Sequence, residues 1–292
     1  MKLLLITIAA FLIALVSASP APGHKRGLAF NNPSTYVQHF NGPNSAVSWA
    51  YNWDSTTDDA FPHNNLQFMP MLWSDAPDHT ANASPSPPSP YLLLKNTAEL
   101  TLSTVQYISR AAIAELESPR SSICISMSPQ RAVDAYRKYM MPFAHREISL
   151  GAPAVTNGPD GLPWLREFVR LCTGCQIDFL PIHWYDAATN ILYFKNHLAE
   201  AHAVTVTGGG GGSRQIWLTE FHGSGTPDEQ VAFLRDVMPW MDATPWISRY
   251  AWFWTEPSYD QGALVHADGQ PTALGLVYAY TPSPLTVCTC TW

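Results

Sequence analysis

Charged residues are scarce in this sequence of 292 residues. Only 13% are Asp, Glu, Lys or Arg, and the formal net charge is −7 at pH 7. This balance disfavours nucleic acid and anionic membranes as partners, because both carry charge of the same sign. A neutral ligand is compatible with it.

Cysteine is also sparse, and the pattern of a zinc site is missing. The five cysteines are Cys124, Cys172, Cys175, Cys288 and Cys290. A zinc site at Cys172 and Cys175 would need two further ligands at a suitable spacing, and no second convincing pair is present. We predict that this pair forms a disulfide or contributes to two disulfides, and we expect neither a metal nor a cofactor.

Long apolar runs are missing beyond the N-terminus. Residues 3–16 form an almost unbroken apolar run after Lys2, and small residues follow at 17–19. A basic start, a short apolar core and a small-residue exit are typical of a secretory signal peptide. The run is shorter than the roughly 20 residues of a membrane helix. We predict a signal peptide at residues 1–19 and a secreted protein outside the membrane; the alternative is an uncleaved anchor.

The remaining chain alternates between strand-like and helical segments. About 270 residues suit a (β/α)8 barrel built as one domain. Short apolar runs predict strands at 27–31, 46–51, 67–72, 91–94, 148–152, 178–184, 216–221 and 250–254. Helical spacing is clearest at 129–141, 162–172, 190–203 and 228–241. We predict an α/β protein, a monomeric (β/α)8 TIM barrel over residues 20–281, with a tail at 282–292 that has no assigned role.

Aromatic, amide and carboxyl side chains gather at the ends of the predicted strands. They include Asn31, Trp49, Asn52, Trp73, His183, Tyr185, Glu220, Trp252 and Trp254. Reactive side chains of such barrels lie at the C-terminal strand ends. Sugar rings stack on aromatic faces, and their hydroxyl groups need directional polar partners. This combination predicts a sugar-binding site.

Glu220 is the clearest catalytic candidate, because it follows four largely apolar residues at a strand end. Glycoside hydrolysis normally needs two carboxyl groups, one as nucleophile or base and one as proton donor. Glu220 fits the first role, with His183 or Tyr185 as hydrogen-bond partners that keep it ionised. The alternative is a structural ion pair. Because adjacent strand residues face opposite ways, Trp184 and Trp252 are also candidates for the core.

Several motifs, in order, resemble fungal glycosyl hydrolases of family 128, the alkali-sensitive-linkage type. They read HKRGLAFN at 24–31, SWAYNW at 48–53, FMPMLW at 68–73, LGAPAVTN at 150–157, DFLPIHWY at 178–185, WLTEF at 217–221 and RYAWF at 249–253. The similarity runs from about Lys25 to Tyr280 with one gap. It implies a (β/α)8 barrel that cleaves β-1,3-glucan with retention of configuration, and it implies that Glu220 is the nucleophile.

The strand ends and the matched motifs together give the expected substrate contacts. These are Asn31, Trp49, Asn52, Trp73, Asn157, His183, Tyr185, Phe221, Trp252 and Trp254. The expected partner is a polysaccharide, β-1,3-glucan, and the expected location is the extracellular side, in the cell wall.

The proton donor that the resemblance implies is missing from its place. A Phe-Asn-Glu-Pro-Asp-like motif should follow the fourth strand, but two alignments put Thr97 or Ser118 in the place of its Glu. The roughly twenty residues between them have no counterpart in the family, within an atypical insertion at about 95–125. One hypothesis is a gene-model fault, in which a retained intron and a frame error hide the donor. The other is a real insertion that has replaced the donor with Glu117, Glu115 or Glu99.

Three functions compete at this point. The first is a secreted, retaining, endo-acting β-1,3-glucanase that remodels fungal cell wall. The second is a catalytically impaired glucan-binding wall protein. The third is an esterase-type hydrolase, which would need a Gly-x-Ser-x-Gly elbow; the nearest segment, 223–225, lacks that spacing.

Overall fold

The computed structural model describes residues 25–31, 33–40, 42–63, 66–73, 75, 80, 91–94, 127–144, 146, 148–207, 214–257 and 262–283. Three predictions lie outside these residues: the signal peptide at 1–19, the insertion at 95–125 with Glu117, and the tail beyond residue 283. Within the described residues, no helix has the length and apolar character needed to cross a membrane.

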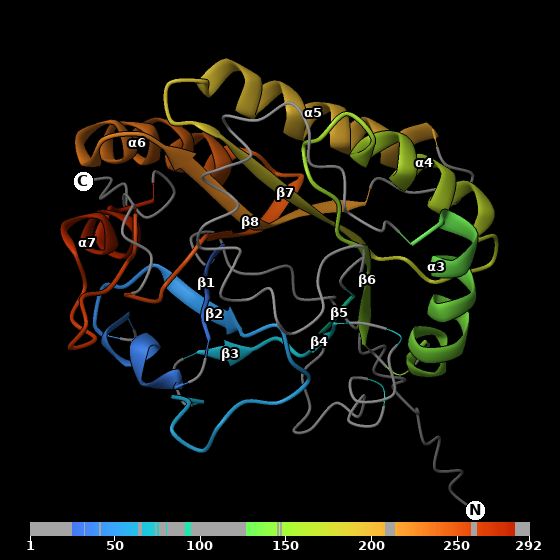
Figure 1. Cartoon of the computed structure of the whole chain (residues 1–292), viewed down its shortest axis with the longest axis horizontal. Coiled ribbons are helices and arrows are strands. Elements are labelled where there is room, and N and C mark those ends of the chain that lie inside the picture. Colours follow the sequence, from blue (N-terminus) through green and yellow to red (C-terminus); the bar gives the residue numbers. More distant parts are fainter. Residues whose placement is uncertain are drawn as a thin grey trace, which may run out of the picture.

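The strands form one curved parallel sheet with helices along its outer side (Figure 1). The order of its nine strands is β3-β2-β1-β9-β8-β7-β6-β5-β4. Their bounds are β1 (Arg26–Ala29), β2 (Val47–Tyr51), β3 (Gln67–Phe68), β4 (Met71–Leu72), β5 (Tyr91–Leu94), β6 (Ser149–Pro153), β7 (Phe179–Ala187), β8 (Gln215–Ser224) and β9 (Ile247–Trp252). Each predicted strand position carries a strand, so the parallel α/β architecture is confirmed.

The predicted third strand at 67–72 is divided at Met69 and Pro70. β3 pairs with β2, whereas β4 pairs with β5, so the two end strands of the sheet are neighbours in the chain. Proline interrupts a strand because it has no N–H to donate to the ladder. The described sheet is open rather than a closed ring of eight strands. The architecture is a curled parallel sheet with helices, consistent with a TIM-like (β/α)8 fold.

The helices follow the sequence signals closely in the second half of the chain. Their bounds are η1 (Ser34–Phe40), α3 (Pro129–Ala135), η3 (Tyr136–Met140), η4 (Met141–Phe143), α4 (Gly161–Leu171), α5 (Ile191–Thr207), α6 (Pro227–Ala243) and α7 (Ala273–Tyr280). The Ser128 hydroxyl caps α3 by accepting from the Arg131 N–H, and Pro129 occupies the first turn. At α6, Thr226 and Glu229 form a reciprocal capping box.

Large aromatic rings fill the interior of the sheet near the N-terminal strand ends. Trp217 stacks on Phe179 at 3.9 Å between ring centroids and lies 5.8 Å from Trp49. Gly27 leaves the room that Trp49 needs, because a Cβ there would lie 2.1 Å from the indole. The Arg249 guanidinium lies 4.8 Å from the Trp217 ring centroid. These rings therefore pack together inside the sheet near the N-terminal strand ends.

A buried ion pair ties the N-terminal end of β1 to the helices. Arg26 Nη2 lies 2.9 Å from Asp242 Oδ2, and the Tyr250 hydroxyl donates to Asp242 Oδ1 at 2.7 Å. Arg26 also donates to the carbonyl oxygens of Tyr278 and Thr281. Burial opposes the charge of Arg26, but Tyr250 and Asp242 outweigh it and raise the pKa of Arg26. Arg26 therefore stays charged, and its contacts join β1 to α6 and α7.

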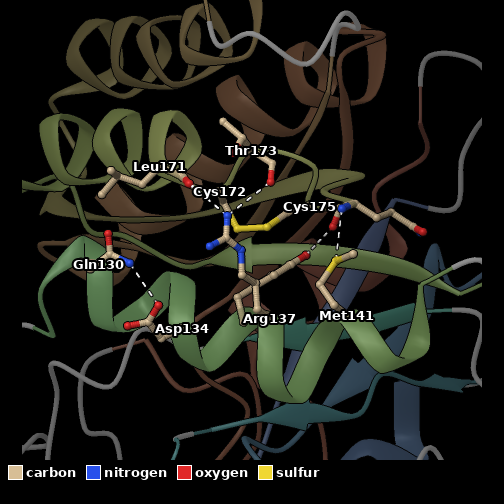
Figure 2. Close-up of a disulfide and its surroundings, with 10 residues drawn as sticks. Gln130, Asp134, Arg137, Met141, Leu171, Cys172, Thr173 and Cys175 are labelled. Atoms are coloured by element: carbon tan, nitrogen blue, oxygen red, sulfur yellow. Dashed lines mark hydrogen bonds between the residues drawn. A yellow bond between two sulfur atoms is a disulfide. The ribbon is translucent and has the colours of Figure 1, made fainter.

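A disulfide joins Cys172 and Cys175 at the end of α4 (Figure 2). The Arg137 guanidinium, from η3, donates to the carbonyl oxygens of Leu171 and Thr173 beside it, at 3.4 and 3.3 Å. The predicted pairing of these two cysteines is confirmed. These contacts fix the turn that leads from α4 toward β7.

Candidate active site

Glu220 lies on β8 beside a β-bulge. Ile182 of β7 pairs with Leu218, and the next residue, His183, pairs with Glu220. Thr219 therefore has no counterpart on β7. A bulge of this kind inserts one extra residue and re-aims the side chains that follow it.

The bulge decides which way Glu220 points. Trp217 packs in the interior cluster of the sheet, and Leu218 packs in the cluster beneath the helices. Strict alternation would place Glu220 on the same side as Leu218. The extra residue Thr219 shifts the pattern by one. As a result, Phe221 packs beneath the helices and the Glu220 carboxylate turns inward.

Two short hydrogen bonds reach the buried Glu220 carboxylate, and a third hydroxyl lies near it. The Tyr185 hydroxyl donates to Oε2 at 2.6 Å, and Trp53 Nε1–H donates to Oε1 at 2.9 Å. The Tyr51 hydroxyl lies 3.5 Å from Oε1 and donates to the Thr219 carbonyl at 2.9 Å. Burial, and then the charge of Glu220, raise the pKa of Tyr51 well above its usual value. Tyr51 therefore remains a protonated donor, and donors of this kind favour the ionised carboxylate.

His183 approaches the same carboxylate from β7. Its Nδ1 lies 3.3 Å from Glu220 Oε2, and its Nε2 lies 3.1 Å from Thr219 Oγ1. The His183 and Thr219 side chains are both buried. His183 thus links the nucleophile candidate to the hydroxyl of the bulge residue.

Tyr185 is held by a second polar residue, Asn157, which follows β6. The Asn157 amide accepts from Tyr185 N–H at 3.0 Å and donates to the Tyr185 carbonyl at 3.1 Å. Tyr193, at the start of α5, donates to the Asn157 carbonyl at 3.1 Å. Asn157 therefore acts on Glu220 through Tyr185.

Trp53 reaches Glu220 from the loop after β2, in an unusual backbone conformation. Its φ is 61°, in the left-handed region that bulky residues rarely adopt. The Asn52 side chain accepts from the Asp54 N–H and donates to the Thr56 carbonyl, which ties the loop together around Trp53. The Trp53 indole lies 5.5 Å from the Trp254 ring centroid. The loop therefore presents the indole N–H to the carboxylate.

Sugar-cleaving barrels place catalytic carboxyl groups at the C-terminal ends of parallel strands, and the buried Glu220 carboxylate fits this placement. A family model described as the glycosyl hydrolase catalytic core matches residues 27–278. This chain belongs to that family. Within the described residues, no group of three or more His, Cys, Asp or Glu side chains is placed to hold a metal ion.

Solved structures place this glycosyl hydrolase domain in the GH128 type. A curdlan-specific exo-β-1,3-glucanase of GH128 subgroup III from Blastomyces gilchristii, solved with glucose, is 33% identical; the match covers 89% of this chain and 100% of that one, with a TM-score of 0.70. A subgroup II endo-β-1,3-glucanase from Sorangium cellulosum is 24% identical over 89% of this chain and 99% of that chain, with a TM-score of 0.69. The second likeness shows the fold.

A curated relative is the alkali-sensitive linkage protein 1 of Schizosaccharomyces pombe. It is 26% identical over 272 residues, which cover 87% of this chain and 44% of that protein. The glycosyl hydrolase domain thus spans less than half the length of this relative.

Three expected substrate contacts of the glycosyl hydrolase are core residues instead. Trp49, Phe221 and Trp252 are each 0% exposed. Trp49 packs in the aromatic cluster near the N-terminal strand ends, and its indole N–H donates to the Lys25 carbonyl. Phe221 and Trp252 pack against each other beneath the helices, at 5.3 Å between ring centroids. A fully enclosed ring offers no face to a sugar, so these three predictions are corrected.

The other expected contacts divide into two groups in the glycosyl hydrolase. His183 and Tyr185 meet Glu220, while Asn52 and Asn157 hold the backbone around its donors. Asn31, Trp73 and Trp254 lie at the C-terminal ends of the strands. Asn31 donates to Glu256 at 3.2 Å, half-buried Trp73 packs on the interior cluster, and Trp254 contacts Trp53. Glu117 lies outside the described residues.

Trp53, Tyr51 and Thr219 were missing from the predicted site of the glycosyl hydrolase. Trp53 and Tyr51 stand at the predicted end of the second strand, so their position was a usable signal. The signal for Thr219 was weaker, because it is the residue before a catalytic candidate and would be expected to alternate away from it.

Proposed function

We propose that this chain hydrolyses β-1,3-glucan by a retaining, endo-acting mechanism, with Glu220 as the nucleophile. The observation that carries the proposal is the buried Glu220 carboxylate, which receives Tyr185 Oη–H at 2.6 Å and Trp53 Nε1–H at 2.9 Å. Support for the substrate comes from the 33% identical relative, which is a β-1,3-glucanase solved with glucose. The endo-acting part is the first of the three functional hypotheses above; the 33% identical relative is exo-acting, so the products decide between endo and exo action.

The proposed reaction uses two steps. A Glu220 oxygen attacks the anomeric carbon while a proton donor protonates the departing glycosidic oxygen, and a glycosyl-enzyme ester forms. Water then attacks the anomeric carbon, the donor group accepts a proton from the water, and the Glu220 carboxylate is released. Tyr185 and Trp53 hold the carboxylate in one orientation and prevent its rotation. Glu117 is the proposed donor, and we expect its carboxyl group about 5–5.5 Å from that of Glu220.

The reaction is tested on laminarin with the chain as it stands. We expect release of reducing ends, β-configured at first by NMR, and a loss on the order of 10⁴-fold in Glu220→Gln. Oligosaccharides of mixed length would support endo action, whereas glucose alone would contradict it. Tight binding of laminarin without release of reducing ends would contradict hydrolysis and would favour a glucan-binding wall protein.

The donor needs a separate experiment. A general acid contributes about 10²–10⁴-fold in rate, so Glu117→Gln should lose that much on laminarin and far less on an aryl glucoside with a good leaving group. Azide should restore turnover of the aryl substrate. Glu115→Gln and Glu99→Gln test the two alternative donors in the same way. Equal activity in all three variants would remove Glu117 from the mechanism.

We also propose that residues 20–281 form a closed (β/α)8 barrel that acts as a monomer after removal of residues 1–19 and works in the fungal cell wall. Closure is supported by hydrogen bonds at Met69 and Pro70, the two residues between β3 and β4. Met69 N–H donates to the Ala50 carbonyl on one side, and the Pro70 carbonyl accepts from Leu93 N–H on the other side. Export is tested by expression in a fungal host. A secreted product that begins near Pro20 is expected, and retention inside the cell would contradict it.

A further inference from the structure

The bulge residue Thr219 is fully enclosed and makes two directed contacts. Its side chain is 1% exposed, so solvent does not compete for the hydroxyl. Its carbonyl accepts from Tyr51 at 2.9 Å, and its Oγ1 lies 3.1 Å from His183 Nε2. The other ring nitrogen, His183 Nδ1, lies 3.3 Å from Glu220 Oε2. Thr219, His183 and Glu220 thus form a line of three polar groups.

The electrostatics of this line select one arrangement of protons. A lone pair on Nδ1 would face the carboxylate oxygen and repel it, so Nδ1 carries the proton. In a neutral imidazole the other nitrogen, Nε2, then has the lone pair. A threonine hydroxyl can rotate to donate to that lone pair. The hydroxyl of Thr219 is therefore the group that matches the tautomer facing Glu220.

We propose that Thr219 is a positioning residue, whose hydroxyl donates to Nε2 of His183 and so holds the Nδ1–H of the ring toward Glu220 as an additional donor. The inference rests on the proposed role of Glu220 as nucleophile and deepens it. Thr219 does not touch the substrate in this scheme. The bulge gives the residue two tasks, because the extra position turns Glu220 inward and also brings the hydroxyl onto His183.

The tautomer is measured directly, without any substrate. The chain has ten histidines, so the imidazole nitrogens are labelled with ¹⁵N and His183 is assigned by comparison with His183→Gln. We expect a protonated, pyrrole-type shift for Nδ1 and an unprotonated, pyridine-type shift for Nε2. A protonated Nε2, in either a neutral ring or an imidazolium, would overturn the proposal.

Two variants of the same residue separate the hydroxyl from the shape of the side chain. Thr219→Val keeps the branched shape and removes the hydroxyl, whereas Thr219→Ser keeps the hydroxyl. In Thr219→Val we expect the Nε2 shift to move toward that of a pyridine-type nitrogen without a hydrogen-bond donor, and kcat on laminarin to fall about tenfold with little change in KM, the loss expected for one buried hydrogen bond. Thr219→Ser should retain the wild-type Nε2 shift and a kcat within about threefold of wild type.

The outcomes distinguish this inference from the proposed function. An Nε2 shift that is unchanged in Thr219→Val would overturn the role of Thr219, whether or not the chain hydrolyses glucan. Absence of hydrolysis in the wild type would remove the proposed function, while the tautomer in the folded wild type would still decide the proton arrangement. If Thr219→Val fails to fold, as judged by thermal unfolding, the wild-type tautomer and Thr219→Ser carry the test.

Discussion

Two buried carboxylates in this protein, Asp242 and Glu220, have opposite surroundings. Asp242 belongs to α6 and faces the N-terminal end of β1. Its Oδ2 lies 2.9 Å from Nη2 of the permanent cation Arg26, and its Oδ1 accepts from the Tyr250 hydroxyl at 2.7 Å. Glu220 lies at the other end of the sheet and receives a hydroxyl and an indole N–H at 2.6 and 2.9 Å, with the His183 imidazole at 3.3 Å. Both side chains are almost fully enclosed.

The difference fits the proposed roles of the two groups, a structural charge at Asp242 and a reactive one at Glu220. A guanidinium neutralises its carboxylate and fixes both groups in place, which suits a joint between β1 and α6. Hydroxyl and indole donors keep a carboxylate ionised and oriented but leave most of its negative charge on the oxygens. A nucleophile needs that charge. The comparison therefore predicts that Asp242 acts on stability and Glu220 acts on turnover.

The largest expected effect in this comparison is on stability. Asp242→Asn leaves Arg26 buried without its counter-charge, so we expect the free energy of unfolding to fall by about 3–5 kcal/mol. Denaturant unfolding measures it. The control is Asp236→Asn, which removes the exposed pair of Asp236 with Lys195 and should cost less than about 1 kcal/mol. Equal effects in the two variants would contradict the structural role of Asp242.

The donors to Glu220 should have the next largest effect, and on turnover. Tyr185→Phe removes a short hydrogen bond to a charged group, so we expect kcat on laminarin to fall about 10–100-fold. Tyr51→Phe is the matched control, because its hydroxyl donates mainly to the Thr219 carbonyl. It should lose less than about tenfold. A larger loss in Tyr51→Phe than in Tyr185→Phe would reverse this ranking.

The smallest expected effect lies one step further from the carboxylate. Tyr193→Phe removes the hydroxyl that donates to the Asn157 carbonyl, and Asn157 in turn holds Tyr185. One partly exposed neutral hydrogen bond corresponds to a few-fold change in kcat, about threefold. Steady-state kinetics with the unfolding free energy measured in parallel would check it. A change in stability without a change in kcat would show that Tyr193 serves only the fold.

Much of the fold could be predicted because local signals agreed with tertiary structure. The eight strand positions were readable from apolar runs, and the start of α3 at Pro129 was readable from helical spacing. The division of the third strand was not predicted, although Pro70 was visible, because the position of a proline within a sheet depends on which neighbours pair with it. Helix ends moved by only a few residues.

The site was harder to predict, because it depends on which face of the sheet each strand residue takes and on contacts between residues far apart in the sequence. Phe221 and Trp252 were expected in the cleft, but the bulge at Thr219 sends Phe221 outward and Trp252 faces the helices. No residue type in this segment indicates a β-bulge. Trp53 meets Glu220 across 167 positions of the chain, through a left-handed backbone that its sequence does not signal.

The aromatic layer of Trp49, Phe179 and Trp217 has a consequence for how a polymer can be handled. Within the described residues, these rings fill the inner face of the sheet near the N-terminal strand ends, on the far side of the Glu220 carboxylate. We therefore expect a glucan strand bound in the proposed site to lie across the C-terminal strand ends. A product fragment would then leave by dissociating sideways from that face.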